Sequence, residues 1–206
     1  MLSEFFCQQP RWDIHKRQTP WCIYMSYNRI LETTTYIIVC GDDYPSSDTV
    51  KARLQASFSG VSEEVSSKLH IRNPYLLHCM IFHEAFVEAK SIITKLRHRL
   101  YDQLDKVDDY AKDTLDRKTL EILTIELHGV SQDTDSLLAS ADMAEMIATR
   151  MQAAHSRFEE LVVVSELKDK TVKINDSLRY LQTSVQSQRR WLLSYKSRKD
   201  IAMNLV

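Results

Sequence analysis

Carboxylates gather near the middle of the chain, where aspartates recur at positions 102, 105, 108, 109, 113 and 116. A magnesium ion binds hard oxygen ligands of this kind, takes few of them from the protein and keeps several waters. The candidate metal ligands are therefore Asp105, Asp108, Asp109 and Asp113. Lysines and arginines interleave with these aspartates and offset most of their charge. A solvated acidic turn is thus the alternative interpretation of the same cluster.

Histidines beside acidic residues raise the question of hydrolytic chemistry. A zinc protease of the HExxH type needs two histidines four residues apart on one helix. His83-Glu84 fits the first half of that motif, but Val87 stands where the second histidine would be. A buried or half-buried structural histidine is therefore predicted on this helix, which carries both His78 and His83. His155 occupies a core heptad position of a later helix and is also predicted to be a buried structural histidine. The sequence also lacks the GxSxG turn that presents a nucleophilic serine, so we predict that the chain is not an enzyme.

A basic stretch with aromatic residues lies near the end of the chain, from Arg189 to Lys199. Its cations are Arg189, Arg190, Lys196, Arg198 and Lys199, with Trp191 and Tyr195 among them. Such a stretch can contact an anionic membrane surface, at about 1 kcal/mol for each cation near that surface. The solvated face of a long helix explains the same residues. The whole chain has a net charge of −1, so no nucleic-acid partner is expected.

Composition restricts the fold that holds these residues. The 206 residues include three glycines and four prolines, well below the roughly 7% and 5% of average proteins. Rossmann and P-loop nucleotide sites and most all-β folds need glycine at fixed turns, so this composition excludes them. The four cysteines match no zinc spacing and are interpreted as reduced thiols. Since no apolar run approaches the 20 or so residues of a membrane span, we expect a cytoplasmic protein, membrane-associated only if it is part of a longer one.

The first region, residues 1–73, predicts a small α/β part. Alternating side chains at 21–27 and the β-branched run 33–40 predict two strands, which are expected to pair antiparallel. Gly41-Asp42-Asp43 ends the second strand, and Ser46-Ser47-Asp48 can cap a helix that runs to Phe58. A further short helix is expected between Ser62 and His70. This region therefore precedes the helical part as a separate small unit.

The second region, residues 74–206, predicts three long antiparallel helices at about 74–111, 117–167 and 171–206. Asn73-Pro74 starts the first, because asparagine caps and proline is tolerated at the first helical position. The middle helix carries apolar residues in a strict 4-3-4-3 spacing from Leu123 to Val162, which is typical of coiled-coil packing. Polarity peaks at Lys168 to Thr171, so the break before the last helix is expected there. Since no proline or glycine enforces it, one continuous helix is the alternative.

Several short strings in this region point to a family. Ile71-Arg72-Asn73-Pro74-Tyr75-Leu76-Leu77-His78 opens the first long helix and His83-Glu84 follows in register; later strings are Leu123 to His128, Ala153-Ala154-His155 and Arg198 to Val206. They resemble the cytosolic domain of the fungal CorA-like magnesium-transporter family. That family transports through two C-terminal membrane helices joined by a Gly-Met-Asn loop, and this sequence contains neither. The resemblance implies a soluble domain in which carboxylates at subunit contacts sense magnesium.

Three functions are expected on these grounds. The first is a non-catalytic soluble domain of the CorA-like type, with a role in assembly or in ion-linked regulation and no cofactor other than magnesium. The alternative is a helical coiled-coil adaptor that self-associates or binds another helical protein through its heptad seams. The third is an uncharacterised enzyme of fungal secondary metabolism.

Overall fold

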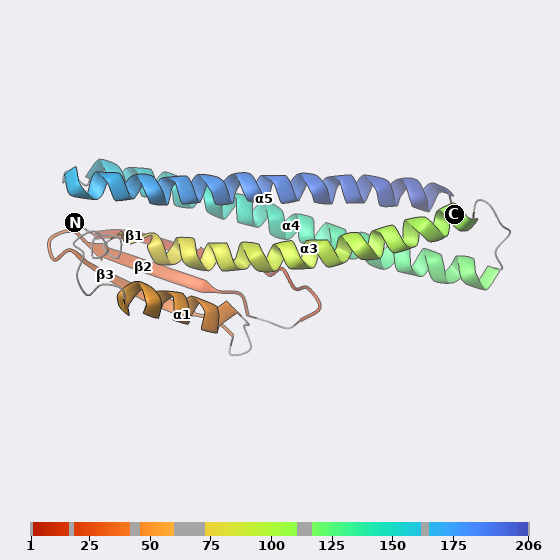
Figure 1. The fold of residues 1–206 in the computed structure, drawn as a ribbon, viewed down its shortest axis with the longest axis horizontal. Helices are drawn as coiled ribbons and strands as arrows, with labels where there is room; N and C mark the ends of the chain where they lie inside the picture. Colours follow the sequence, from red (N-terminus) through yellow and green to blue (C-terminus); the bar gives the residue numbers. More distant parts are fainter. Residues whose placement is uncertain are drawn as a thin grey trace.

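The fold is mainly α-helical, with a small α/β part at the N-terminus, as predicted. The computed structural model describes residues 2–16, 19–41, 46–59, 73–110, 117–161 and 165–205. Three long helices form an elongated bundle, and a three-stranded sheet with one shorter helix lies beside one half of it (Figure 1). The first and last long helices run in the same direction, and the middle helix runs antiparallel to both.

The sheet consists of β1 (Leu2–Gln8), β2 (Cys22–Asn28) and β3 (Thr33–Val39), in that spatial order and with both pairs antiparallel. The prediction of only two strands was wrong, because β1 is a third. Its pattern is masked by Phe5 and Phe6, which are adjacent apolar residues on opposite faces. Phe5 packs against the core, whereas Phe6 is 63% exposed. Apolar residues on both faces hide the alternation that identifies a half-buried strand.

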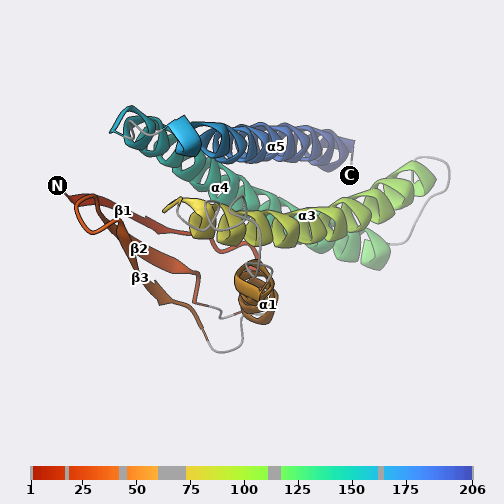
Figure 2. The same cartoon turned by 60° about the vertical axis from the view of Figure 1, so that its left-hand side comes forward.

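One face of the sheet packs on the helices, and a short turn fixes its register. Cys7, Ile23 and Met25 are buried on this inner face, which lies toward the bundle in Figure 2. At the turn between β2 and β3, the Oδ1 atom of Asn28 accepts hydrogen bonds from the backbone N–H groups of Ile30 and Leu31, at 3.0 and 3.2 Å. An asparagine side chain that bonds its own turn in this way favours a tight reversal.

The first two helices begin where the sequence predicts. Helix α1 spans Ser46–Ser59, and α3 spans Leu76–Tyr110. The Oδ1 atom of Asn73 accepts a hydrogen bond from the backbone N–H of Tyr75 at 2.9 Å, which confirms the predicted cap. The carbonyl oxygen of Pro74 accepts a 2.6 Å hydrogen bond from the Tyr36 hydroxyl, so β3 is tied to the start of α3. The short helix expected at 62–70 lies outside the described residues.

Helix α4 spans Arg117–Leu161 and α5 spans Ser165–Leu205. The two pack along each other as an antiparallel hairpin, so the alternative of one continuous helix is wrong. The break was predicted between Lys168 and Thr171, but these residues belong to α5. Charged residues such as lysine and glutamate are good helix formers, and a local peak in polarity is therefore a poor signal for a helix end.

The predicted seam of α4 forms the centre of the core. Each of its described members is buried, namely Leu123, Leu127, Val130, Thr134, Leu137, Ala141, Ala144, Ala148, Met151, His155 and Phe158. The seam of α5 is buried in the same way from Ile174 to Ala202 and includes one amide, that of Gln188. A fully buried Leu or Met contributes about 1.5–3 kcal/mol. Burial of these two stripes against α3 is the main stabilising contribution.

Candidate functional site

The predicted metal ligands lie at the end of α3. Asp105, Asp108 and Asp109 have exposed side chains there, and Asp113 lies outside the described residues. Within the described part of the chain, no three histidine, cysteine, aspartate or glutamate side chains are grouped so that they could hold a metal ion. A magnesium-linked role therefore stays a prediction from the sequence.

Of the histidines predicted to be structural, His78 and His155 are fully buried and His83 is half-buried. The His78 ring lies 5.2 Å from the Phe5 ring, centroid to centroid, with Tyr36 and Tyr75 close by. The Nε2 atom of His155 is 3.4 Å from the Asn73 amide nitrogen. Burial lowers the pKa of His78 and that of His155 to about 4, because a low-dielectric interior disfavours the imidazolium. Both are thus neutral at neutral pH, and both lie in the packed interior of the protein.

The basic stretch at the end of the chain is largely engaged with other helices. Arg189 pairs with Asp142 on α4, and the Lys196 Nζ atom lies 2.7 Å from an Asp135 carboxylate oxygen. Further contacts are donated by Lys199 to the Ser131 hydroxyl on α4 and by Arg198 to the Tyr101 hydroxyl on α3. Four of the five cations therefore contact side chains of α3 or α4. Lipid contact by this stretch stays a prediction.

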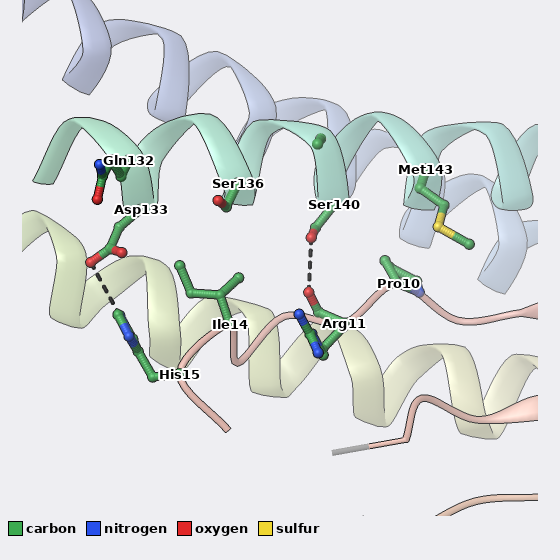
Figure 3. A pocket seen from close by; sticks show the side chains of 10 residues that line it. Pro10, Arg11, Ile14, His15, Gln132, Asp133, Ser136, Ser140 and Met143 are labelled. Atoms are coloured by element: carbon green, nitrogen blue, oxygen red, sulfur yellow. Dashed lines mark hydrogen bonds and ion pairs between the residues drawn. The ribbon is translucent and has the colours of Figure 1, made fainter. Parts of the chain in front are cut away.

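A loop between β1 and β2 reaches across the bundle and brings together residues far apart in sequence. Its described part comprises residues 9–16 and 19–21, called the junction loop below. Trp12 and Trp21 anchor it in the core. The Ser140 hydroxyl on α4 donates a 2.9 Å hydrogen bond to the carbonyl oxygen of Arg11 (Figure 3). The junction loop therefore lies on α4 rather than in solvent.

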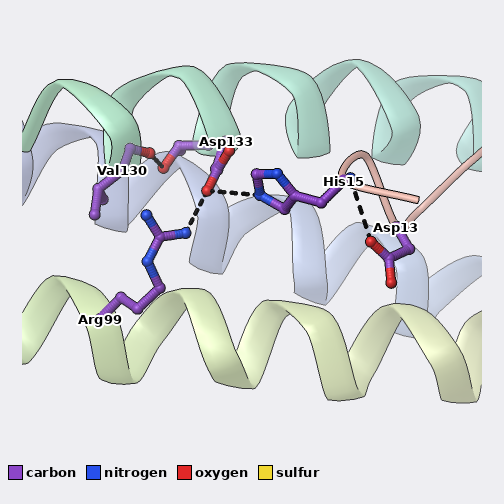
Figure 4. A network of polar contacts seen from close by, with 6 residues as sticks. Asp13, His15, Arg99, Val130 and Asp133 are labelled. Atoms are coloured by element: carbon purple, nitrogen blue, oxygen red, sulfur yellow. Dashed lines mark hydrogen bonds and ion pairs between the residues drawn. The ribbon is translucent and has the colours of Figure 1, made fainter. Parts of the chain in front are cut away.

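The buried carboxylate of Asp133 joins the junction loop to two helices. The His15 Nε2 atom lies 3.2 Å from the Asp133 Oδ2 atom, and the Arg99 guanidinium on α3 donates to the same oxygen (Figure 4). Asp133 itself belongs to α4 and is only 7% exposed. The cluster therefore connects α3, α4 and the loop through one charged group. A charge-assisted contact of this kind is stronger than one between neutral groups.

This cluster contains the residue types of a serine hydrolase but not the geometry. Ser136, His15 and Asp133 line one open cavity of about 590 Å³. Catalysis would need the histidine to accept the proton of the serine hydroxyl, yet no hydrogen bond joins Ser136 to His15 in Figure 3. Arg99 also neutralises the Asp133 carboxylate directly. The cluster therefore holds the junction loop against α3 and α4. The sequence did not predict it, because His15 and Asp133 are 118 positions apart.

A second surface feature is a groove between the parallel helices α3 and α5, called the α3–α5 groove. Its volume is about 600 Å³. Six residues from each helix line it with identical spacing: Phe86, Lys90, Ile93, Thr94, Arg97 and Tyr101 from α3, and Tyr180, Ser184, Ser187, Gln188, Trp191 and Tyr195 from α5. The first and last residues of each set are fifteen positions apart, or about 22 Å along a helix at 1.5 Å per residue. The groove is therefore lined by side chains at helical intervals along both helices.

The Gln188 side chain is the unusual group of this groove. It is only 8% exposed, and neither its amide nitrogen nor its amide oxygen has a hydrogen-bond partner in the described part of the protein. Leaving a buried polar group unpaired costs about 1–3 kcal/mol. Gln188 also stands in the α5 seam, where the repeat calls for an apolar residue. The seam prediction included Gln188, but only the structure places this amide at a groove.

Comparisons of the chain with protein-family models, with curated proteins and with solved structures give no match. The likeness to CorA-like transporters therefore depends on the short strings described above and on nothing further. None of the helices that the structure describes combines the length and the apolar character needed to cross a membrane.

Proposed function

We propose that this protein is a non-catalytic helical interaction module that binds an acidic helix of a partner protein along the α3–α5 groove. This is the adaptor function among the three expected from the sequence. The observation that carries it is the groove itself, with its exposed aromatic residues. The CorA-like role and the enzymatic role stay predictions.

The shape of the groove favours a helical partner. Two parallel helices that present side chains at the same intervals form a groove in which a third helix can lie. Helix-in-groove binding uses anchor residues spaced by three and four positions. Trp191 is 56% exposed and Tyr180 is 60% exposed at this surface. Large aromatic side chains are enriched in interface hot spots, so their exposure here fits a surface that a partner covers.

Charge favours an acidic partner over a second copy of the chain. The charged residues that line the α3–α5 groove are Lys90 and Arg97, and its described lining includes no carboxylate. Two identical grooves placed face to face would bring these cations together, which is unfavourable. Carboxylates on a partner helix would meet them instead, and complementary charge of this kind raises association rates and specificity.

Synthetic helices test this function directly. The probe is an amphipathic peptide of about 21 residues, or six turns, with leucines at its a and d positions and glutamates at e and g. A matched peptide carries lysines in place of the glutamates. We expect the glutamate peptide to bind the full chain in a fluorescence anisotropy titration and the lysine peptide to bind much more weakly. Equal binding of the two peptides would contradict the charge argument.

Two variants locate the binding surface. Trp191→Ala removes a groove aromatic and should weaken the glutamate peptide about 30-fold, the effect of a 2 kcal/mol hot spot. Leu193→Ala is the matched control, because Leu193 is 43% exposed on the same helix but does not line the groove. Wild-type affinity in Trp191→Ala would refute the site. If sedimentation shows a dimer and Trp191→Ala abolishes it, the groove serves self-association, and the proposal of an acidic partner is refuted.

A further inference from the structure

A second, smaller cavity lies beneath the junction loop, on the side facing α3, and is called the junction cavity. Its volume is about 310 Å³, and residues 13–16 of the loop, α3 and α4 enclose it. Small-molecule sites run from about 300 to 1,000 Å³, so this volume suits a small ligand. The junction cavity is separate from the α3–α5 groove and shares no residue with it.

The interior of the junction cavity is aliphatic. Ile14, Ile92, Leu96 and Leu137 line it, and the last two belong to the buried core. These side chains offer no hydrogen bond to a ligand. Transfer of methylene groups from water to such a surface is favourable by the hydrophobic effect. The part of a ligand that enters the cavity is therefore an apolar tail.

The rim of the junction cavity carries an excess of positive charge. Its cations are Lys16, Lys95 and Arg99, and its carboxylates are Asp13 and Asp133. Lys16 Nζ lies 3.1 Å from an Asp13 oxygen, and Arg99 pairs with Asp133 (Figure 4). The remaining cation, Lys95, is exposed at the rim and has no acidic partner within the described residues. The His15 ring also lines the cavity and already contacts Asp133.

We propose that the junction cavity binds a small aliphatic monocarboxylate, with its tail between Ile92 and Leu137 and its carboxylate on Lys95. An apolar pocket with one or a few well-placed polar groups is the usual form of a small-molecule site. Here the aliphatic walls favour the alkyl tail of the ligand, and the unpaired ammonium of Lys95 favours a negatively charged head group. The ligand would bridge the junction loop and α3, and this inference does not depend on the function of the α3–α5 groove.

Isothermal titration calorimetry of the full chain with a series of alkyl carboxylates tests the site. The probes are hexanoate, octanoate and decanoate, each kept below its critical micelle concentration. We expect the affinity to rise about fourfold with each added methylene until the tail fills the cavity. Octylammonium has the same tail with the opposite charge and should bind at least tenfold more weakly than octanoate. Equal affinity for the two, or no saturable binding of any carboxylate at millimolar concentration, would overturn the proposal.

Two lysines of α3 provide a matched pair of variants. Lys95→Glu reverses the rim charge and should weaken octanoate binding at least tenfold. Lys90→Glu changes another exposed lysine of the same helix, one that lines the α3–α5 groove, and it should leave octanoate binding unchanged. Ile92→Trp should fill the cavity and abolish binding while the circular dichroism spectrum stays that of the wild type. Unchanged affinity in Lys95→Glu would refute the assigned head-group contact.

Discussion

Acid should destabilise this bundle through a histidine that lies in an aromatic pocket. The His78 side chain is fully buried, and the rings around it belong to Phe5, Tyr36 and Tyr75. Neither ring nitrogen has a hydrogen-bond partner among the described residues. Below pH 6.5, where His78 is protonated in the unfolded chain, folding must therefore expel that proton, and lowering the pH makes this step more costly.

The size of the effect follows from the two pKa values of His78. Burial lowers the pKa from 6.5 to about 4 in the folded protein. Between these values the unfolded chain binds more protons, so stability is complete above pH 6.5 and is lost as the pH falls. At pH 5 the loss from one such group is about 2 kcal/mol, taking 1.36 kcal/mol per pH unit. This is a large fraction of the 5–15 kcal/mol that stabilises a typical domain.

Urea unfolding followed by circular dichroism at pH 7.5 and pH 5 measures this loss. His78→Phe keeps a ring in the pocket and removes the titrating group. Between pH 7.5 and pH 5, the free energy of unfolding of this variant should therefore decrease by about 2 kcal/mol less than that of the wild type. His155 titrates in the same direction and keeps part of the pH dependence in that variant. His98→Gln changes an exposed histidine of α3 and serves as the control. An identical pH dependence in wild type and His78→Phe would refute the reasoning.

Two further predictions concern α4. Gly129→Ala should stabilise the protein by about 0.5–1 kcal/mol, because glycine within a helix is less favourable than alanine by this amount. The new Cβ atom would lie 3.5 Å from Arg99 Nη2, which is an ordinary contact. A lower melting temperature would show that α4 needs the glycine. Leu137→Asp places a charge in the core and should abolish cooperative unfolding, since a buried unpaired charge is very costly. The same change at Ile125, which is 61% exposed, should alter stability by less than about 0.5 kcal/mol; equal effects at both positions would contradict the seam.

The heptad stripes were the part of the fold that the sequence predicted best. The residues from Leu123 to Phe158 that the spacing places on one face are all buried. A helix repeats every 3.6 residues, so the face that turns inward is a property of local spacing. The cap at Asn73 was predicted for the same reason, because a capping side chain acts on its own turn. The missed β1 strand shows the limit of this logic, since its pattern depends on what covers each face.

Both candidate sites were decided by the tertiary structure. The sequence marked Trp191 and Tyr195 as part of a basic stretch that either contacts lipid or forms a solvated helix face, and nothing in it connected them to Phe86 or Lys90 on α3. It also gave no sign that His15 would meet Asp133. Local periodicity determines which residues face inward, whereas a groove or an ion cluster depends on which helices become neighbours and in what relative direction. Those choices are set by the packing of the whole bundle, and spacing along one segment does not contain them.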